Sequence, residues 1–192
     1  MKKILKISLI IFGLFISFGK YALADENSLK EDIHDAIYKT IDGKLTYDIS
    51  VKSIGGESDI DIRMSNADEP YLPSASTIKI FIGLSMRDAI YDGDFPYSRD
   101  IKEDLDLALR NSDNDATNRL IEKLGFDRIN QTIYKYTRSD KTKLNRLMLG
   151  QGEENITNSK DLIAGFIEIY KSNDDISKDM VTSMAVSYTH LR

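Results

Sequence analysis

Two short motifs in the sequence hold the residue types that nucleophilic acyl transfer needs. Ser76 and Lys79 stand three residues apart at the start of the most apolar stretch that follows the N-terminal segment. A serine hydroxyl attacks a carbonyl effectively only when a base takes its proton. Side chains three apart on a helix share one face, and apolar surroundings favour a neutral amine, so Lys79 can act as that base.

The second motif is Ser112, Asp113, Asn114, which lies between two amphipathic segments where a loop can present polar groups to a cleft. The Ser112 hydroxyl could pass a proton between lysine and a leaving nitrogen, and the Asn114 amide could hold lysine and a substrate carbonyl. Both motifs also have structural explanations. A lysine can extend from a core helix to the surface, and a Ser-Asp pair often caps a helix.

Several regular elements are predicted around these motifs. Alternating apolar residues at 45–52 and 60–64, with Gly55 and Gly56 between them, predict a two-stranded hairpin. A helix from Ser76 to Met86, apolar nearly all round, should be central, with Ser74 placed as its N-cap. Further helices are predicted from Ser28, at 101–109, at 116–124 with Gly125 as terminating cap, at 126–136, and at 160–170 behind Ser159.

Composition indicates one globular domain, because 192 residues with 41% hydrophobic and 30% charged side chains can form a core. Lysines at the N-terminus, an apolar run at 7–18 and the small-residue site Ala22-Leu23-Ala24 predict a signal peptide over residues 1–24. The alternative is a membrane anchor, but the run is shorter than the ~20 residues a spanning helix needs. We therefore expect secretion to the extracellular or cell-wall side, without stable membrane anchoring.

The net charge bears on whether the protein binds nucleic acid, and the cysteine content on whether disulfides support its fold. The first 24 residues hold four lysines and no acid, so their removal changes the formal net charge from −5 to −9. A chain this acidic is not expected to bind nucleic acid. It contains no cysteine, so no disulfide can support the fold of the exported protein.

The run from Ala75 to Lys79 followed by Ser112, Asp113, Asn114 resembles the penicillin-recognising serine enzymes, class A β-lactamases in particular. Residues 66–70, 116–125, 144–145 and 155–161 also resemble that family, so the similarity runs from about Ser28 to Tyr170. It implies an α+β fold, in which an all-helical lobe stands beside an antiparallel sheet covered by helices, with the nucleophile at their junction.

The resemblance also implies roles for five residues. Ser76 would be the nucleophile, Lys79 its base and Ser112 the proton relay. Asn114 and Asn145 would orient lysine, substrate and water. The implied substrate is a small β-lactam or a D-alanyl-D-alanine peptide of the cell wall. No metal or organic cofactor is implied, and we expect a monomer.

The sequence departs from that family in three places. Four residues before Asn145, where a glutamate activates the deacylating water, it has Lys141, so a shifted base would have to be Asp140, Glu153 or Glu154. The stretch between Met86 and Ile101 is shorter than the equivalent stretch in typical members of that family. The Lys-Thr-Gly motif of the family is not found in the sequence.

We therefore expect a domain at 25–185 that is truncated before the Lys-Thr-Gly strand, with an incomplete sheet, and a non-native tail at 186–192. Edge strands without neighbours predict that this chain is unstable or inactive alone. Two alternatives to a β-lactam hydrolase remain. One is a penicillin-binding peptidase with slow deacylation, and the other is a non-catalytic secreted binding domain.

Overall fold

The computed structural model describes residues 26–41, 45–55, 60–67 and 71–186. These residues fall into two compact units, which divide between Leu72 and Pro73 and are described separately here. The predicted signal peptide lies outside the described residues. So does the predicted tail, except Val186, which is the last residue of the final helix. The α+β class predicted from the sequence is confirmed.

The first unit is one helix and one hairpin. It contains α1 (Glu26–Ile41), β1 (Asp48–Lys52) and β2 (Asp61–Ser65). The strands pair antiparallel, with Asp48 opposite Ser65 and Lys52 opposite Asp61. Alternate residues of β2, Ile62 and Met64, are buried against partly buried residues that include Leu29 and Ile33 of α1. The hairpin prediction is confirmed, while Gly56 of the predicted turn lies outside the described residues.

The second unit is mainly helical. It contains a 3-10 turn, η1 (Ala75–Ile78), and six helices: α2 (Lys79–Tyr91), α3 (Arg99–Arg110), α4 (Asn114–Leu124), α5 (Phe126–Thr137), α6 (Ser159–Lys171) and α7 (Asp175–Val186). A short strand, β3 (Leu72–Pro73), leads into it and pairs with β4 (Ile156–Thr157).

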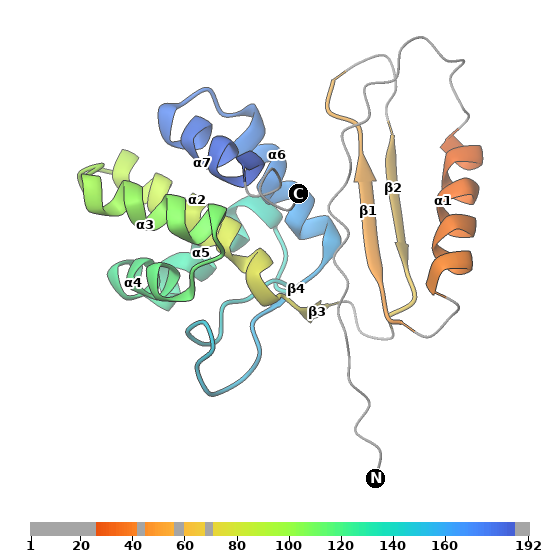
Figure 1. Ribbon diagram of the computed structural model, residues 1–192, viewed down its shortest axis with the longest axis horizontal. Coiled ribbons are helices and arrows are strands. Elements are labelled where there is room, and N and C mark those ends of the chain that lie inside the picture. The colour runs from red at the N-terminus through yellow and green to blue at the C-terminus, as the bar shows by residue number, and fades with distance from the viewer. Residues whose placement is uncertain (1–25, 42–44, 56–59, 68–70, 187–192) are drawn as a thin grey trace. The chain divides into compact units, whose positions relative to one another are not determined.

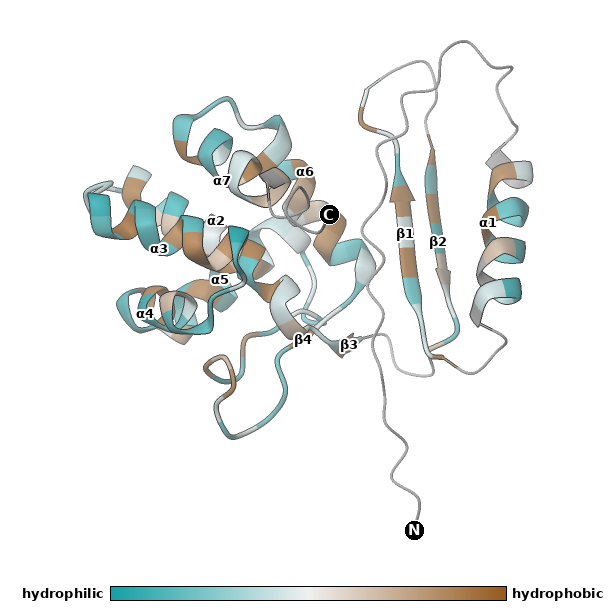
Figure 2. Ribbon diagram, in the orientation of Figure 1, coloured by the Kyte–Doolittle hydropathy of each residue, from teal (hydrophilic) through white to brown (hydrophobic). Residues whose placement is uncertain are grey.

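Helix α2 is the centre of the second unit, as its apolar sequence predicts. It contacts each of the other five helices, α3 to α7, and its side chains from Lys79 to Arg87 are all buried. The surrounding helices are amphipathic, and Figure 2 shows hydrophilic and hydrophobic residues side by side on α3 and α4. In α3, for example, Ile101, Leu105 and Ala108 form the buried stripe. Figure 1 shows this helical unit and, separately, the hairpin with α1.

The start of the central helix differs from the prediction. Ser76 lies in η1 rather than in the α-helix, which begins at Lys79. Ser74 occupies the N-cap position, but its backbone is helical (φ −72°, ψ −22°) and its side chain caps no amide. A capping side chain needs an extended backbone to reach the amides that follow, so this cap prediction is wrong.

Two other boundaries also need correction. The cap of α6 is Asn158, not Ser159, because Asn158 has the extended backbone and its side chain accepts the Asp161 N–H at 2.9 Å. Helix α7 was not predicted, although Asp174 marks its start by accepting the Ser177 N–H at 2.8 Å. The other helices agree with prediction to within a few residues, and Gly125 ends α4 at φ 77°.

Candidate active site

Lys79 is the centre of a buried polar cluster. The residue is 3% exposed, yet its Nζ has four oxygen neighbours. They are the Ser112 carbonyl at 2.6 Å, Asn114 Oδ1 at 2.9 Å, Ser112 Oγ at 3.0 Å and the Asp113 carbonyl at 3.4 Å. The lysine therefore does not extend to solvent. The second motif supplies all of its partners.

The loop between α3 and α4 aims these partners by an unusual backbone conformation. Ser112 has φ 55°, a left-handed conformation that is uncommon for a residue with a side chain. In this conformation both the carbonyl and the hydroxyl of Ser112 lie within hydrogen-bond distance of Lys79 Nζ. Asp113 then caps α4 by accepting the Ala116 N–H at 2.7 Å, which fixes Asn114 as the first residue of that helix.

Ser76 reaches this cluster through Ser112. The two hydroxyl oxygens are 2.7 Å apart, and Ser112 Oγ is in turn 3.0 Å from Lys79 Nζ. Ser76 and Lys79, both described, share no direct hydrogen bond, so the connection between nucleophile and amine runs through the Ser112 hydroxyl. Ser76 is exposed at this point, which leaves its oxygen accessible to a substrate.

Burial lowers the pKa of Lys79 to about 8, although the nearby charge of Asp113 opposes the shift. A neutral amine has two N–H groups and one lone pair. Its two N–H groups can bond the Ser112 carbonyl and Asn114 Oδ1, and the lone pair is then left for the Ser112 hydroxyl. The arrangement thus suits an amine that accepts a proton relayed from Ser76.

Asn145, the fifth predicted site residue, lies on a separate loop. Its Nδ2 donates to the Glu154 carbonyl at 2.7 Å, and its N–H donates to Asn155 Oδ1 at 2.7 Å. No described residue donates to its Oδ1. It makes no hydrogen bond to Ser76, Lys79 or Ser112, so the structure brings together four of the five predicted residues by direct contact.

The carboxylates considered as a shifted base have other partners or face solvent. Asp140 pairs with Lys141 at 3.4 Å, and its side chain is 82% exposed. Glu154 pairs with Arg146 at 2.6 Å, and Glu153 is exposed. None of the three hydrogen-bonds to the Ser76, Ser112 and Lys79 cluster.

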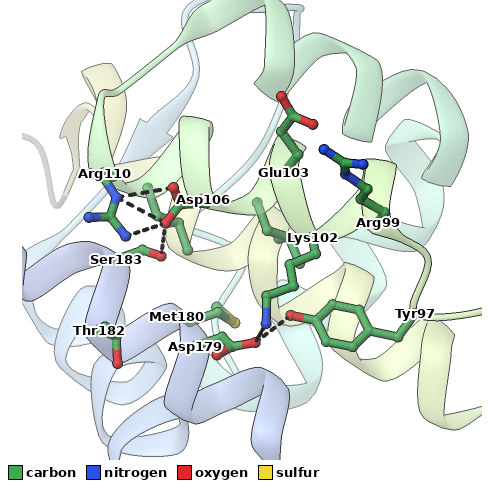
Figure 3. Close-up of a pocket in the computed structure, with 12 residues that line it drawn as sticks. Tyr97, Arg99, Lys102, Glu103, Asp106, Arg110, Asp179, Met180, Thr182 and Ser183 are labelled. Carbon is green, nitrogen blue, oxygen red and sulfur yellow. Dashed lines mark hydrogen bonds and ion pairs between the residues drawn. The ribbon is translucent and has the colours of Figure 1, made fainter.

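A hollow between α3 and α7 is a separate feature (Figure 3). It has a volume of about 370 Å³, and none of its lining residues is a predicted site residue. Lys102 and Tyr97 bond Asp179 at 2.7 and 2.9 Å, and Arg110 pairs with Asp106 at 2.7 Å. These charged groups satisfy one another, which suggests packing between helices rather than a reactive centre.

The described residues contain no helix long and apolar enough to span a membrane. Nor do they contain three or more histidine, aspartate or glutamate side chains grouped as metal ligands.

Residues 98–188 match the family model described as "Beta-lactamase enzyme family", a segment that includes Ser112, Asn114 and Asn145. A crystal structure of a β-lactamase from Sphaerobacter thermophilus DSM 20745 has a similar fold, with a TM-score of 0.62 at 20% sequence identity. The similarity covers 81% of this chain and 67% of that one. Both comparisons are with β-lactamases, the family model by sequence over residues 98–188 and the crystal structure by fold. No curated protein matches the sequence.

Neither comparison describes the contacts that join the two motifs in this chain. The family match begins after Ser76 and Lys79. These two residues are tied to the matched segment by the hydrogen bonds of Ser112 and Asn114.

Proposed function

We propose that the protein is a secreted serine hydrolase that β-lactams acylate at Ser76. The observation that carries this proposal is the chain of contacts from Ser76 Oγ to Ser112 Oγ at 2.7 Å and on to Lys79 Nζ at 3.0 Å. It supplies what a serine nucleophile needs, a base reached through one relay. The substrate class is a small molecule with a strained amide.

In the acylation step, Ser76 Oγ bonds to the lactam carbonyl carbon. Its proton passes to Ser112 Oγ, whose own proton moves to the neutral amine of Lys79. The carbon–nitrogen bond then breaks, and the leaving nitrogen takes a proton from Ser112. Lys79 returns a proton to Ser112, so the step ends with an acyl-enzyme and with both relay groups in their starting states.

Two further groups can stabilise the reacting carbonyl. The first bond of η1 runs from the Thr77 N–H to the Ser74 carbonyl at 3.0 Å, so the Ser76 N–H precedes the helical hydrogen bonds. That N–H can donate to the developing oxyanion. Asn114 uses Oδ1 for Lys79, and no described residue accepts from its Nδ2, which can bind a substrate carbonyl.

The test is mass spectrometry of the protein after incubation with benzylpenicillin. We expect one covalent adduct, located on the peptide that contains Ser76, and none in a Ser76→Ala variant. Ser65→Ala, which removes another exposed serine hydroxyl, is the matched control and should react like the wild type. An adduct that persists in Ser76→Ala would mean that another residue is the nucleophile.

A second candidate function keeps acylation but not turnover. It is favoured by Lys141, which is exposed and paired with Asp140 at the position where the family carries a water-activating glutamate. In this case the protein would be a penicillin-binding peptidase-like protein that acts on D-alanyl-D-alanine peptides. A long-lived adduct together with cleavage of such a peptide supports it, and rapid return to the free mass supports the hydrolase.

Export and a monomeric state are part of the proposal and need their own measurements. Export predicts that the mature protein begins near Asp25, which N-terminal sequencing of protein from the culture medium or cell wall can test. Sedimentation of the purified protein tests the monomer.

A further inference from the structure

We propose that Asn130 is a positioning residue, which fixes the backbone that carries Asn145; the inference rests on the proposed acylation of Ser76. Asn130 lies on α5, and no motif singles it out. Its Nδ2 donates to the Leu144 carbonyl at 3.0 Å, and its Oδ1 accepts the Leu144 N–H at 2.9 Å. One side chain on a helix thus satisfies both backbone groups of the residue before Asn145.

Asparagine side chains also hold the rest of this loop. Asn155 accepts the N–H groups of Asn145 and Arg146 at 2.7 and 2.9 Å, and donates to the Arg146 carbonyl at 3.0 Å. On α4, Asn118 accepts the Met148 N–H at 2.7 Å and donates to its carbonyl at 3.2 Å. The segment 144–148 is neither helix nor strand, so these amides do what backbone partners do in regular structure.

The loop at 144–155 is connected both to the turn that carries Ser76 and to the helix that carries Asn114. The Asn155 carbonyl accepts the Ser74 N–H at 2.7 Å, two residues before Ser76. Asn118 lies one helical turn after Asn114, the partner of Lys79. The backbone that carries Asn145 is therefore connected to the nucleophile turn on one side and to α4 on the other.

The direction of the Asn145 side chain depends on the anchor at Leu144. Leu144 is 1% exposed, so its side chain is fixed in the core while Asn130 fixes its N–H and carbonyl. The next residue then has its N–H on Asn155 and its Nδ2 on the Glu154 carbonyl, which leaves Oδ1 to orient a water or a substrate N–H. A displacement of about 1 Å at such a group can cost a large factor in rate.

The sharpest variant is Asn130→Asp. It keeps the size and the acceptor for the Leu144 N–H, but it replaces the donor with a carboxylate oxygen facing the Leu144 carbonyl. Gln131→Glu is the matched control, because it makes the same amide-to-acid change at the exposed neighbouring position. Neither substitution touches Ser76, Lys79 or Ser112.

Mass spectrometry can follow both the formation of the benzylpenicillin adduct and its loss over hours. We expect Asn130→Asp to slow loss of the adduct about tenfold and to change its formation less than about threefold. Gln131→Glu should change neither. In an Asn145→Ala background, Asn130→Asp should have no further effect on adduct loss, because the group that it positions is gone.

Equal slowing of both steps, no slowing at all, or the same slowing in the Asn145→Ala background would overturn this inference. A wild-type adduct that never decays would also overturn it, because Asn145 would then orient no water. If Asn130→Asp unfolds, as thermal denaturation would show, Asn130→Ser must give the same separation of the two rates. A wild type that forms no Ser76 adduct overturns the proposed function as well, which distinguishes the two failures.

Discussion

Nζ of Lys79 lies 2.9 Å from Oδ1 of Asn114, so a neutral amide, not a carboxylate, is the polar side chain that neighbours the amine besides Ser112. This choice matters for the protonation state of Lys79. A carboxylate at that distance would stabilise the ammonium form. The amide holds the lysine in place and lets burial lower its pKa to about 8.

Acylation should therefore depend on pH through Lys79. The base must be neutral, so the acylation rate should rise with pH and reach half its maximum near pH 8. In Asn114→Asp the new charge favours the ammonium form, and the midpoint should move up by about one unit or more. Asp115→Asn, an exposed neighbour with the opposite charge change, should move it little. Identical profiles in wild type and Asn114→Asp would exclude Lys79 as the titrating base.

Part of this site could be predicted from the sequence, because the two motifs supplied Lys79 and its partners Ser112 and Asn114. The three-residue spacing predicted that Lys79 takes the Ser76 proton, but the structure joins these two residues through Ser112. The relay geometry could not be predicted. It depends on the φ of 55° at Ser112, which no residue type there signals.

The fold shows the same limit. The apolar residues of α2 predicted a central helix, and the alternation at 60–64 predicted a buried strand face. Asn130 was missed because an amide inside an amphipathic helix has no distinctive local pattern. Its partner Leu144 is distant in sequence. Helix α7 was not predicted, although its buried residues Ile176 and Met180 have the four-residue spacing of one helix face.

Arg87 should be the side chain on which the helical unit most depends. Its side chain is 6% exposed, and its guanidinium pairs with Asp88 of the same helix at 3.0 Å and with Glu168 of α6 at 2.9 Å. It also donates to Tyr136 of α5 at 2.6 Å. Arg87→Met removes the cation that pairs with Glu168 and one of the two that pair with Asp88, which keeps Lys135 at 2.7 Å. The loss should cost about 3–5 kcal/mol of unfolding free energy.

Urea denaturation measures this loss, and Lys102→Met provides the comparison. The Lys102 and Asp179 side chains are 58% and 42% exposed, and removing such a surface pair should cost less than about 1 kcal/mol. Equal losses of unfolding free energy in the two variants would show that the buried ion pairs of Arg87 contribute no more to stability than an exposed pair does.

Two glycines on packed helices should respond differently to alanine. A Cβ on Gly165 would lie 2.9 Å from a ring carbon of Phe81 and 3.1 Å from Ile80 Cδ1, both in the core. Gly165→Ala should therefore destabilise by about 1–3 kcal/mol through overpacking. A Cβ on Gly83 meets the terminal methyl of Met180 at 2.6 Å, which a flexible side chain can move.

Gly83→Ala should consequently be close to neutral, since alanine gains about 1 kcal/mol of helix propensity. Thermal unfolding of the two variants measures the difference. A larger loss for Gly83→Ala than for Gly165→Ala would mean that Met180 is held more rigidly than Phe81.

Ser112→Gly should reduce the rate of acylation without reducing the stability of the fold. Glycine adopts φ 55° without strain, and the carbonyl at this position can still accept from Lys79 at 2.6 Å. Stability should thus be kept or slightly raised, while acylation by benzylpenicillin should fall about 10²- to 10⁴-fold because the hydroxyl between Ser76 and Lys79 is missing. Ser112→Ala should lose the same activity but retain the strain, so only its stability should differ from the glycine variant. Acylation of Ser112→Gly at the wild-type rate would mean that the Ser76 proton reaches Lys79 without passing through Ser112.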